Sequence, residues 1–233
     1  MAGRVNVKYS RTGVAKYLSH LDMQRLVSRA IRRTGADVQY SSGFNPHIVL
    51  SFASPLSVGY ATEGDYFECV LLSGSAAEFE KKLNAVLPAG VKVKKVFYAA
   101  EKQKKLMAMN YSAIYEILFR FENDGDCAKI KKVALEFFQA QVFLAKDRKG
   151  REVDIRPLVL EMEWQQGKLA CELKNASDGA LNPAVLAEAL LKQAEIAADY
   201  DIIRVECCYC DNGRSRPFGE LGTPAPYQGA DID

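Results

Sequence analysis

The chain has 233 residues, of which 48% are hydrophobic and 26% charged, the balance of an ordinary globular protein with one or two domains. No apolar run reaches the ~20 residues that a membrane-spanning helix needs. The first ten residues, MAGRVNVKYS, lack the apolar stretch of a secretory signal. These features predict a cytoplasmic protein without a membrane partner, in which the six cysteines stay reduced.

The net charge of +2 conceals an uneven distribution. Residues 1–50 carry eight lysines and arginines against two aspartates, so this part has a net charge of +6 and the rest of the chain sums to −4. A basic region of this kind is typical of a protein that binds phosphate or another anion. A solvated basic surface without a partner is the alternative.

An amphipathic helix is predicted over about 20–34. Ser19 stands three residues before Asp22, in a pattern similar to a capping box, and Gly35 follows the last turn. The 3.6-residue period separates an apolar side from a basic side. The apolar residues are Met23, Leu26, Val27, Ala30 and Ile31, and the arginines on the opposite side are Arg25, Arg29, Arg32 and Arg33.

The first hundred residues predict the element order β-α-β-β-α-β, which is the ferredoxin-like arrangement. Strands are expected at about 5–9, 48–53, 65–72 and 91–98 from their apolar patterns. A second helix begins at the capping box of Ser75 and Glu78 and ends before Pro88. Between the first helix and the second strand, glycine and proline break the chain in the loop SGFNPH.

The same order recurs after a linker at 101–110. Strands are expected at 111–121, 159–164, 168–173 and 201–209, with helices at 127–140 and after Asn182, which precedes Pro183. We therefore predict an α+β protein with two tandem ferredoxin-like domains, each with an antiparallel sheet. The domains are residues 1–100 and 111–210, and a flexible tail covers 211–233.

Several stretches together resemble a bacterial family of unknown function, the radical-SAM-linked or radical-SAM-associated proteins. The stretches are RVNVKYSRTG, YLSHLDMQRLVSRAIRRTG, SSGFNPH, LSFASPLSVG followed by Glu63, and KGREVDIRPL. The first four are closely spaced and jointly specific. The resemblance covers most of residues 4–160.

The resemblance implies a partner, because in this family the domain is often fused to a radical-SAM enzyme or encoded beside one. Neighbouring genes often concern RNA processing and ribosomes, which implies an RNA substrate. The chain lacks the CxxxCxxC motif that holds the radical-SAM cluster. It therefore resembles the accessory part alone, with no cofactor of its own and the enzyme on a separate chain.

The arginine side of the first helix and the following loop are the predicted binding site. Guanidinium groups bind phosphate oxygens in pairs, and an aromatic ring can stack on a base. Substrate binding is assigned to Arg25, Arg29, Arg32, Arg33, Phe44, Asn45 and His47. Two alternatives stay open, a rigid turn with Phe44 in the core and an arginine face paired to acids. A second basic run, between Lys92 and Lys105, would complete a nucleic-acid groove if both runs shared a surface.

His20 and His47 are the candidate catalytic residues, because histidine exchanges protons near neutral pH. The alternatives are structural hydrogen bonds or a metal site, which would need both histidines to converge with a carboxylate. We predict no metal. The cluster of Cys207, Cys208 and Cys210 has poor geometry for zinc, because a strand points Cys207 to the opposite side.

Three functions are compatible with these features of the sequence. The first is a non-catalytic accessory protein that binds RNA or another anionic substrate for a radical-SAM enzyme. The second is a metal-independent ribonuclease in which His20 acts as base. The third is a module that only binds the partner protein.

Overall fold

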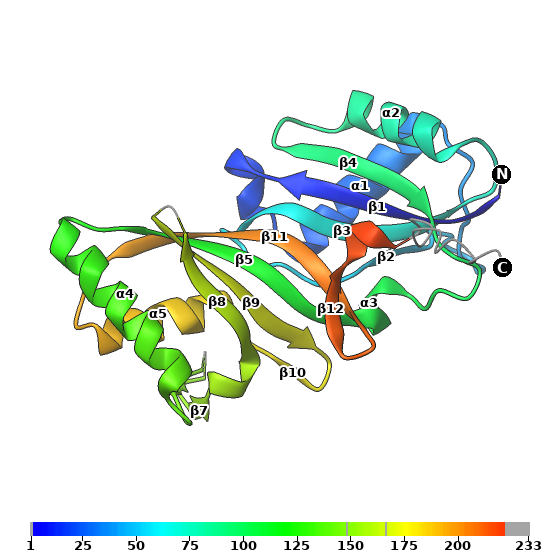
Figure 1. Ribbon diagram of the computed structural model, residues 1–233. Coiled ribbons are helices and arrows are strands. Elements are labelled where there is room, and N and C mark those ends of the chain that lie inside the picture. The colour runs from blue at the N-terminus through cyan, green and yellow to red at the C-terminus, as the bar shows by residue number, and fades with distance from the viewer. Residues whose placement is uncertain (1, 148, 166, 222–233) are drawn as a thin grey trace, which may run out of the picture.

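The computed structural model describes residues 2–147, 149–165 and 167–221 (Figure 1). The N-terminal half has the element order β-α-β-β-α-β that the sequence predicts. Its elements are β1 (Gly3–Arg11), α1 (His20–Thr34), β2 (Leu50–Phe52), β3 (Ala61–Leu71), α2 (Ala76–Val86) and β4 (Val91–Tyr98). The strands are antiparallel in the order β4-β1-β3-β2, with Val7 opposite Phe67 at the centre.

After the short helix at Leu106–Met109, the second half repeats this order, with a short hairpin inserted after the helix at Asp124–Gln139 and a two-residue strand at Gly179–Ala180. Its first elements are α3 (Leu106–Met109), β5 (Asn110–Arg120), α4 (Asp124–Gln139), β6 (Leu144–Lys146), β7 (Glu152–Asp154), β8 (Val159–Gln165) and β9 (Lys168–Ala176). The remaining elements are β10 (Gly179–Ala180), α5 (Pro183–Gln193), β11 (Asp199–Asp211) and β12 (Arg214–Pro217). The long strands are antiparallel in the order β11-β5-β9-β8.

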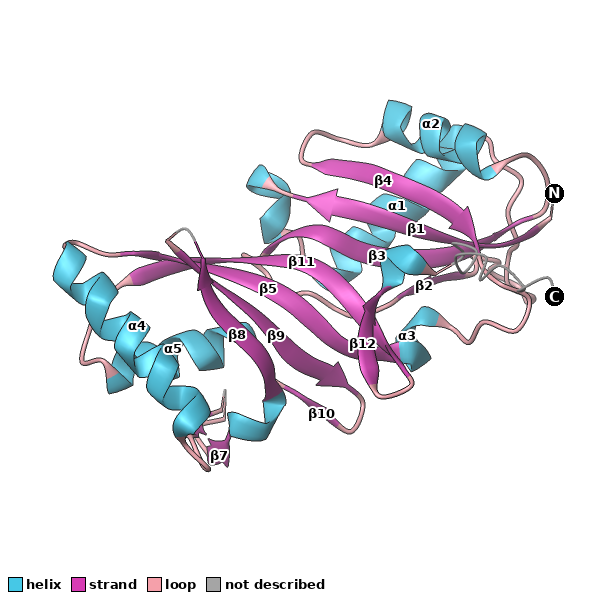
Figure 2. Cartoon of the chain, viewed as in Figure 1, coloured by secondary structure: helices cyan, strands magenta, loops and turns pink. Residues whose placement is uncertain are grey.

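Strands from both halves belong to one ten-stranded sheet within the described residues (Figure 2). This differs from the prediction of a separate antiparallel sheet in each domain. The joint is a short parallel pairing in which Ala61 and Thr62 lie opposite Ile203 and Arg204. An edge strand leaves backbone N–H and C=O groups unpaired. The pairing of β11 with β3 gives hydrogen-bond partners to some of these groups on both strands. The protein is thus of the mixed α+β class.

The long helices cover one face of this sheet. Side chains of α1 and α2, including Ile31 and Leu83, pack on Val7, Phe67 and Val93 of the N-terminal strands. Side chains of α4 and α5 pack on β5, β9 and β11 in a second core. At the joint, the side chain of Arg204 points to the same face of the sheet as Tyr115, its partner on β5, which belongs to the second core. Arg204 also pairs with Asp65, which contacts Tyr9 of the N-terminal core. Both pairs of helices therefore cover the same face of the sheet. None of the helices in the described part of the chain is long and apolar enough to cross a membrane.

Helix α1 begins and ends where the sequence predicts. The Ser19 hydroxyl accepts a hydrogen bond from the backbone N–H of Asp22 (3.1 Å), which satisfies one of the free donors of the first turn. Gly35 ends the helix with φ +64°, a conformation that favours glycine. Met23, Val27, Ala30 and Ile31 are buried, so the apolar side is used by the core and the arginine side is free to face solvent.

The other face of the N-terminal strands is covered by segments outside the two repeats. Leu106 of α3 is fully buried there, although the sequence predicts a linker. Residues 211–221 form the end of β11, β12 and a short 3-10 turn, and Phe218 packs edge-on against Tyr66 with ring centroids 5.5 Å apart. Part of the expected tail is therefore integrated into the fold. The remainder, residues 222–233, lies outside the described residues.

Candidate anion-binding site

The predicted arginines line two hollows along the exposed side of α1. The first hollow, of about 440 Å³, is called here the arginine hollow. It is lined by Gln24, Arg25, Ser28, Arg29, Arg32, His47, Ile48 and Leu50. The second, of about 420 Å³, lies between α1 and the end of α2 and includes Arg25, Arg29 and Arg33 together with the carboxylate of Asp22. Arg25 and Arg29 line both hollows, so the arginines form a continuous basic strip.

The arginine hollow contains three guanidinium groups and no carboxylate. The guanidinium groups of Arg29 and Arg32 form no hydrogen bond or ion pair with any described residue. Arg25 has an exposed pair with Asp22 (3.3 Å), and Arg33 donates to the backbone carbonyl of Val86 (3.2 Å). An exposed pair of this kind contributes little. Pairing of the whole arginine face to acids of the second half, the alternative left by the sequence, is therefore wrong.

The loop after α1 brings His47 to the arginine hollow. The Ser41 hydroxyl lies 2.9 Å from His47 Nδ1 and accepts the His47 backbone N–H (3.1 Å). The backbone N–H of Ser41 donates to the His47 carbonyl (2.8 Å). These contacts close the loop and fix the position of His47, which lines the arginine hollow. A loop and a helix that are separate in sequence thus share one hollow.

Phe44 and Asn45 stand at the exposed tip of the same loop. The Phe44 side chain is fully exposed and is not a core residue, so that alternative is wrong. Asn45 is also exposed. Neither residue lines the arginine hollow. The Phe44 ring is therefore accessible from solvent on the loop that carries His47.

His20 has a different environment from His47 and does not line the arginine hollow. Its ring packs edge-on against Phe52 with centroids 5.5 Å apart. Its Nε2 lies 3.0 Å from Nε2 of Gln24, and because an amide nitrogen can only donate, the imidazole accepts and is neutral. Burial lowers the pKa of His20, with Arg11 and Arg204 acting in the same direction against Asp65. The hollow therefore contains one histidine and not a pair.

The second basic run lies on the other side of the sheet. Lys92 and Lys95 of β4 are opposite Ser10 and Lys8, whereas Val91 and Val93 point to the helix-side core. The linker that carries the remaining lysines crosses this far side, where Gln103 contacts Asn6 (3.2 Å). The two basic runs do not share a surface, so the groove that the sequence suggests does not form.

Asp154 and Arg156, within the stretch KGREVDIRPL, have separate partners in the second half. Asp154 and Arg156 form no ion pair; the Asp154 carboxylate accepts backbone N–H groups of Phe143 (2.9 Å) and Arg156 (3.0 Å). The Arg156 guanidinium instead lies over the ring of Phe138, 4.7 Å from its centroid. No group of metal-ligating side chains occurs among the described residues. Cys207 and Cys208 are buried thiols.

A buried cluster at the joint between the halves was not predicted. Arg204 Nε lies 2.5 Å from Asp65 Oδ1, and both side chains are almost fully buried. The guanidinium also donates to the hydroxyl and carbonyl of Ser54 (both 3.3 Å). Tyr9 donates to the Asp65 carboxylate (3.3 Å). Burial is the largest single influence and would lower the pKa of Arg204, but the charge of Asp65 acts together with Cys207 and Tyr115 in the opposite direction, and the pKa is raised.

Arg11 stabilises the same region from the other side. Its guanidinium donates to the backbone carbonyls of Leu18 (3.0 Å), Ser57 (3.2 Å) and Tyr60 (3.1 Å). Burial lowers the pKa of Arg11. Arg11 and Arg204 therefore hold the loop at 53–60, which lies within the LSFASPLSVG stretch except for Tyr60. The sequence gives no sign of these contacts, because their acceptors are mostly main-chain carbonyls.

The fold and the site together define a mixed α+β protein with a basic hollow on its first helix. The chain belongs to the bacterial family described as "Uncharacterized protein conserved in bacteria (DUF2344)", whose model matches residues 4–183. This match covers the first half and the second half as far as the start of α5, and it includes Arg11 and Asp65. Comparison with curated proteins found no match.

Two solved structures illustrate the level of structural similarity. One is an unknown protein from Galdieria sulphuraria, with a TM-score of 0.27 and 12% identity over 88% of this chain and 99% of the other. The second is a putative glycine cleavage system transcriptional repressor, with a TM-score of 0.24 and 11% identity over the same shares. Similarity at this level does not define a shared fold or function.

Proposed function

We propose that this protein is a non-catalytic accessory protein that binds RNA, or another anionic substrate, through the arginine hollow of α1. The resemblance to radical-SAM-linked proteins supports a radical-SAM enzyme as its partner, on a separate chain in the bacterial cytoplasm. In this proposal each half of the chain is a ferredoxin-like unit. The first unit presents the substrate, and the second contributes to the interaction with the partner.

The observation that carries the proposal is the composition of the arginine hollow. Three guanidiniums and His47 line it without a carboxylate, and like charges that repel one another are stabilised when an anion binds between them. Planar guanidiniums donate two hydrogen bonds to a phosphate. The hollow is open to solvent. The guanidiniums of Arg29 and Arg32 have no ionic partner within the described residues, and the pair of Arg25 with Asp22 is exposed, so phosphate oxygens can replace water there.

RNA is favoured over a free small anion by the extent of the basic strip and by Phe44. Arg33 extends the strip to the second hollow beside Pro88, which gives room for successive phosphates of a strand. Phe44 is the exposed aromatic residue of the loop that carries His47. Stacking on one ring contributes about 1–3 kcal/mol per base, which adds affinity that a single phosphate cannot obtain.

Binding of a short single-stranded RNA of mixed sequence, measured as a function of salt, tests this proposal. The double variant Arg29→Gln/Arg32→Gln removes two phosphate contacts, so the slope of log affinity against log salt should become shallower by about 1.4. Phe44→Ala should weaken binding about fivefold or more at unchanged slope. Lys131→Gln/Lys132→Gln removes the same charge from exposed sites on α4 and serves as the control.

A zero salt slope for the unmodified protein would contradict phosphate binding. An equal loss in the α4 control would show that only net charge matters. The same reactions, analysed for RNA fragments, test the ribonuclease alternative. The structure gives that alternative less support than binding, because the hollow holds His47 alone while Nε2 of His20 accepts from Gln24.

A further inference from the structure

Strand β8 is an edge of the sheet. Among the described residues it pairs with β9 on one side only, through residues such as Met162 opposite Cys171. The outer side of such a strand presents backbone N–H and C=O groups to solvent. These groups can pair with a further strand from another chain. The side chains on either side of this edge therefore decide which strand fits.

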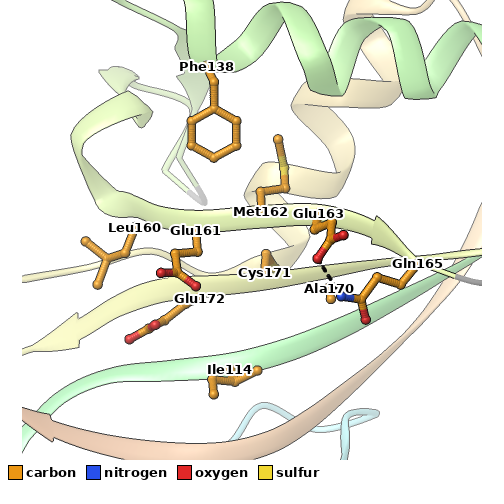
Figure 3. A pocket seen from close by; sticks show the side chains of 10 residues that line it. All are labelled: Ile114, Phe138, Leu160, Glu161, Met162, Glu163, Gln165, Ala170, Cys171 and Glu172. Carbon is orange, nitrogen blue, oxygen red and sulfur yellow. Dashed lines mark hydrogen bonds between the residues drawn. The ribbon is translucent and has the colours of Figure 1, made fainter. Parts of the chain in front are cut away.

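One side of β8 is apolar. Met162 and Trp164 lie beside Leu135 and Phe138 of α4, and the four line a hollow of about 410 Å³ with Lys131, Ala134, Glu163 and Leu169. Leu135 is 72% exposed and Phe138 is 37% exposed. Figure 3 shows Met162 pointing toward Phe138 across the open space between strand and helix. Exposed apolar residues gathered beside a strand edge are typical of a binding surface.

The other side of β8 is acidic. Glu161 and Glu163 alternate with Met162 and Trp164, so their side chains point to the opposite face of the sheet. With Glu172 of β9 they line a second hollow, of about 500 Å³, whose lining also includes Met162 and Phe138 (Figure 3). Glu161 and Glu163 are exposed and form no ion pair within the described residues. The edge therefore offers two uncompensated carboxylates.

We propose that the edge of β8 binds an extended segment of a partner protein in which apolar and basic residues alternate. The segment adds a strand to the sheet, its apolar side chains enter the hollow beside Phe138, and its lysines or arginines face Glu161 and Glu163. Pairing of β8 with a second copy of itself is disfavoured, since it would gather the carboxylates of both copies on one face. This surface is separate from the arginine hollow and does not depend on RNA binding.

Hydrogen exchange of the full chain with the synthetic peptide KVKVKVK tests the proposal. The outward-facing backbone amides of residues 159–165 should exchange more slowly when the peptide is bound, because they gain hydrogen-bond partners. Two peptides N-methylated at alternate amides distinguish strand addition from charge attraction. One of them blocks the amides that face β8 and should bind about tenfold more weakly, whereas the other should bind like the parent.

Charge variants complete the experiment. Glu161→Gln/Glu163→Gln should weaken KVKVKVK binding about fivefold, whereas Glu122→Gln/Glu152→Gln, at exposed sites elsewhere in the second half, should not. The peptide EVEVEVE should not bind. Equal binding of both methylated peptides, or equal loss in both charge variants, overturns the proposal. Protection of β8 that rises with protein concentration alone would assign the edge to a second copy and would also overturn it.

Discussion

At the scale of single residues, Arg204 illustrates how a buried charge is tolerated. Its side chain is 1% exposed, and the Asp65 carboxylate, 3% exposed, lies beside it. The remaining guanidinium N–H groups donate to Ser54 and Pro55 of the loop at 53–60. A buried charge is tolerated when it is both paired and hydrogen-bonded. The pair therefore fixes the position of the loop relative to β11.

Removal of one partner of the Arg204–Asp65 pair should lower the free energy of unfolding. Arg204→Met leaves the Asp65 carboxylate buried without its cation, so we expect the free energy of unfolding to fall by about 3–5 kcal/mol in urea denaturation. The control is Arg120→Met, whose exposed guanidinium pairs with Asp201 and whose loss should cost about 0–1 kcal/mol. The double variant Asp65→Asn/Arg204→Met should recover part of the loss. Equal effects of the two single variants would contradict this account.

The residues of the candidate site were predictable one by one but not as a group. The helical period places Arg25, Arg29 and Arg32 on the polar side of α1, because the apolar residues between them are needed by the core. No periodicity relates these positions to His47. Its place in the arginine hollow follows from the loop contacts at Ser41, and His20 is directed to Phe52 instead.

At the scale of elements, the contact of β3 with β11 depends on Gly64. A Cβ at this position would overlap the Val205 carbonyl oxygen and come within 2.9 Å of the Glu206 Cα. Both are backbone atoms and cannot move aside as a flexible side chain can. A glycine in a strand commonly marks such a close approach of two backbones.

Gly64→Ala should therefore disturb the joint between the halves. We expect a loss of about 1–3 kcal/mol of unfolding free energy from overpacking, with faster amide exchange at residues 61–62 and 203–204. Gly3→Ala is a matched control in β1, since the atom closest to its Cβ would be Tyr98 Cδ1 at an ordinary 3.5 Å. Unchanged stability of Gly64→Ala would show that the backbones can separate without cost.

At the scale of the whole molecule, the shared sheet and the Arg204–Asp65 pair couple the two halves. Trp164, the single tryptophan of the chain, belongs to the second half, so its fluorescence reports that half alone. Far-ultraviolet circular dichroism reports both halves. We expect the two signals to follow one urea transition with the same midpoint, because coincident probes are the mark of a cooperative unit.

The matched comparison is with Gly64→Ala, which weakens the joint without altering either core. In this variant the two signals should separate, the fluorescence transition keeping the midpoint of the second half. Separate midpoints in the unmodified protein would show that each half unfolds independently. The shared sheet would then contribute little to stability.

The order of helices and strands could be predicted from the sequence alone. The signals that predict these elements act over only a few residues, so they can be recognised in the sequence. They are the alternation of Val5, Val7 and Tyr9, the caps at Ser19 and Asn182, and the glycine at Gly35. The basic side of α1 was predictable for the same reason.

Only the tertiary structure decided how these elements meet. Three arrangements join residues that are far apart in the chain: the pairing of β3 with β11, the burial of Arg204 beside Asp65, and the convergence of His47 with the α1 arginines. The tertiary structure also places Lys92 and Lys95 of β4 on the face away from α1. The physical reason is that these contacts depend on which strand edges and faces remain unpaired once the halves have formed, and no local pattern in the sequence carries that information.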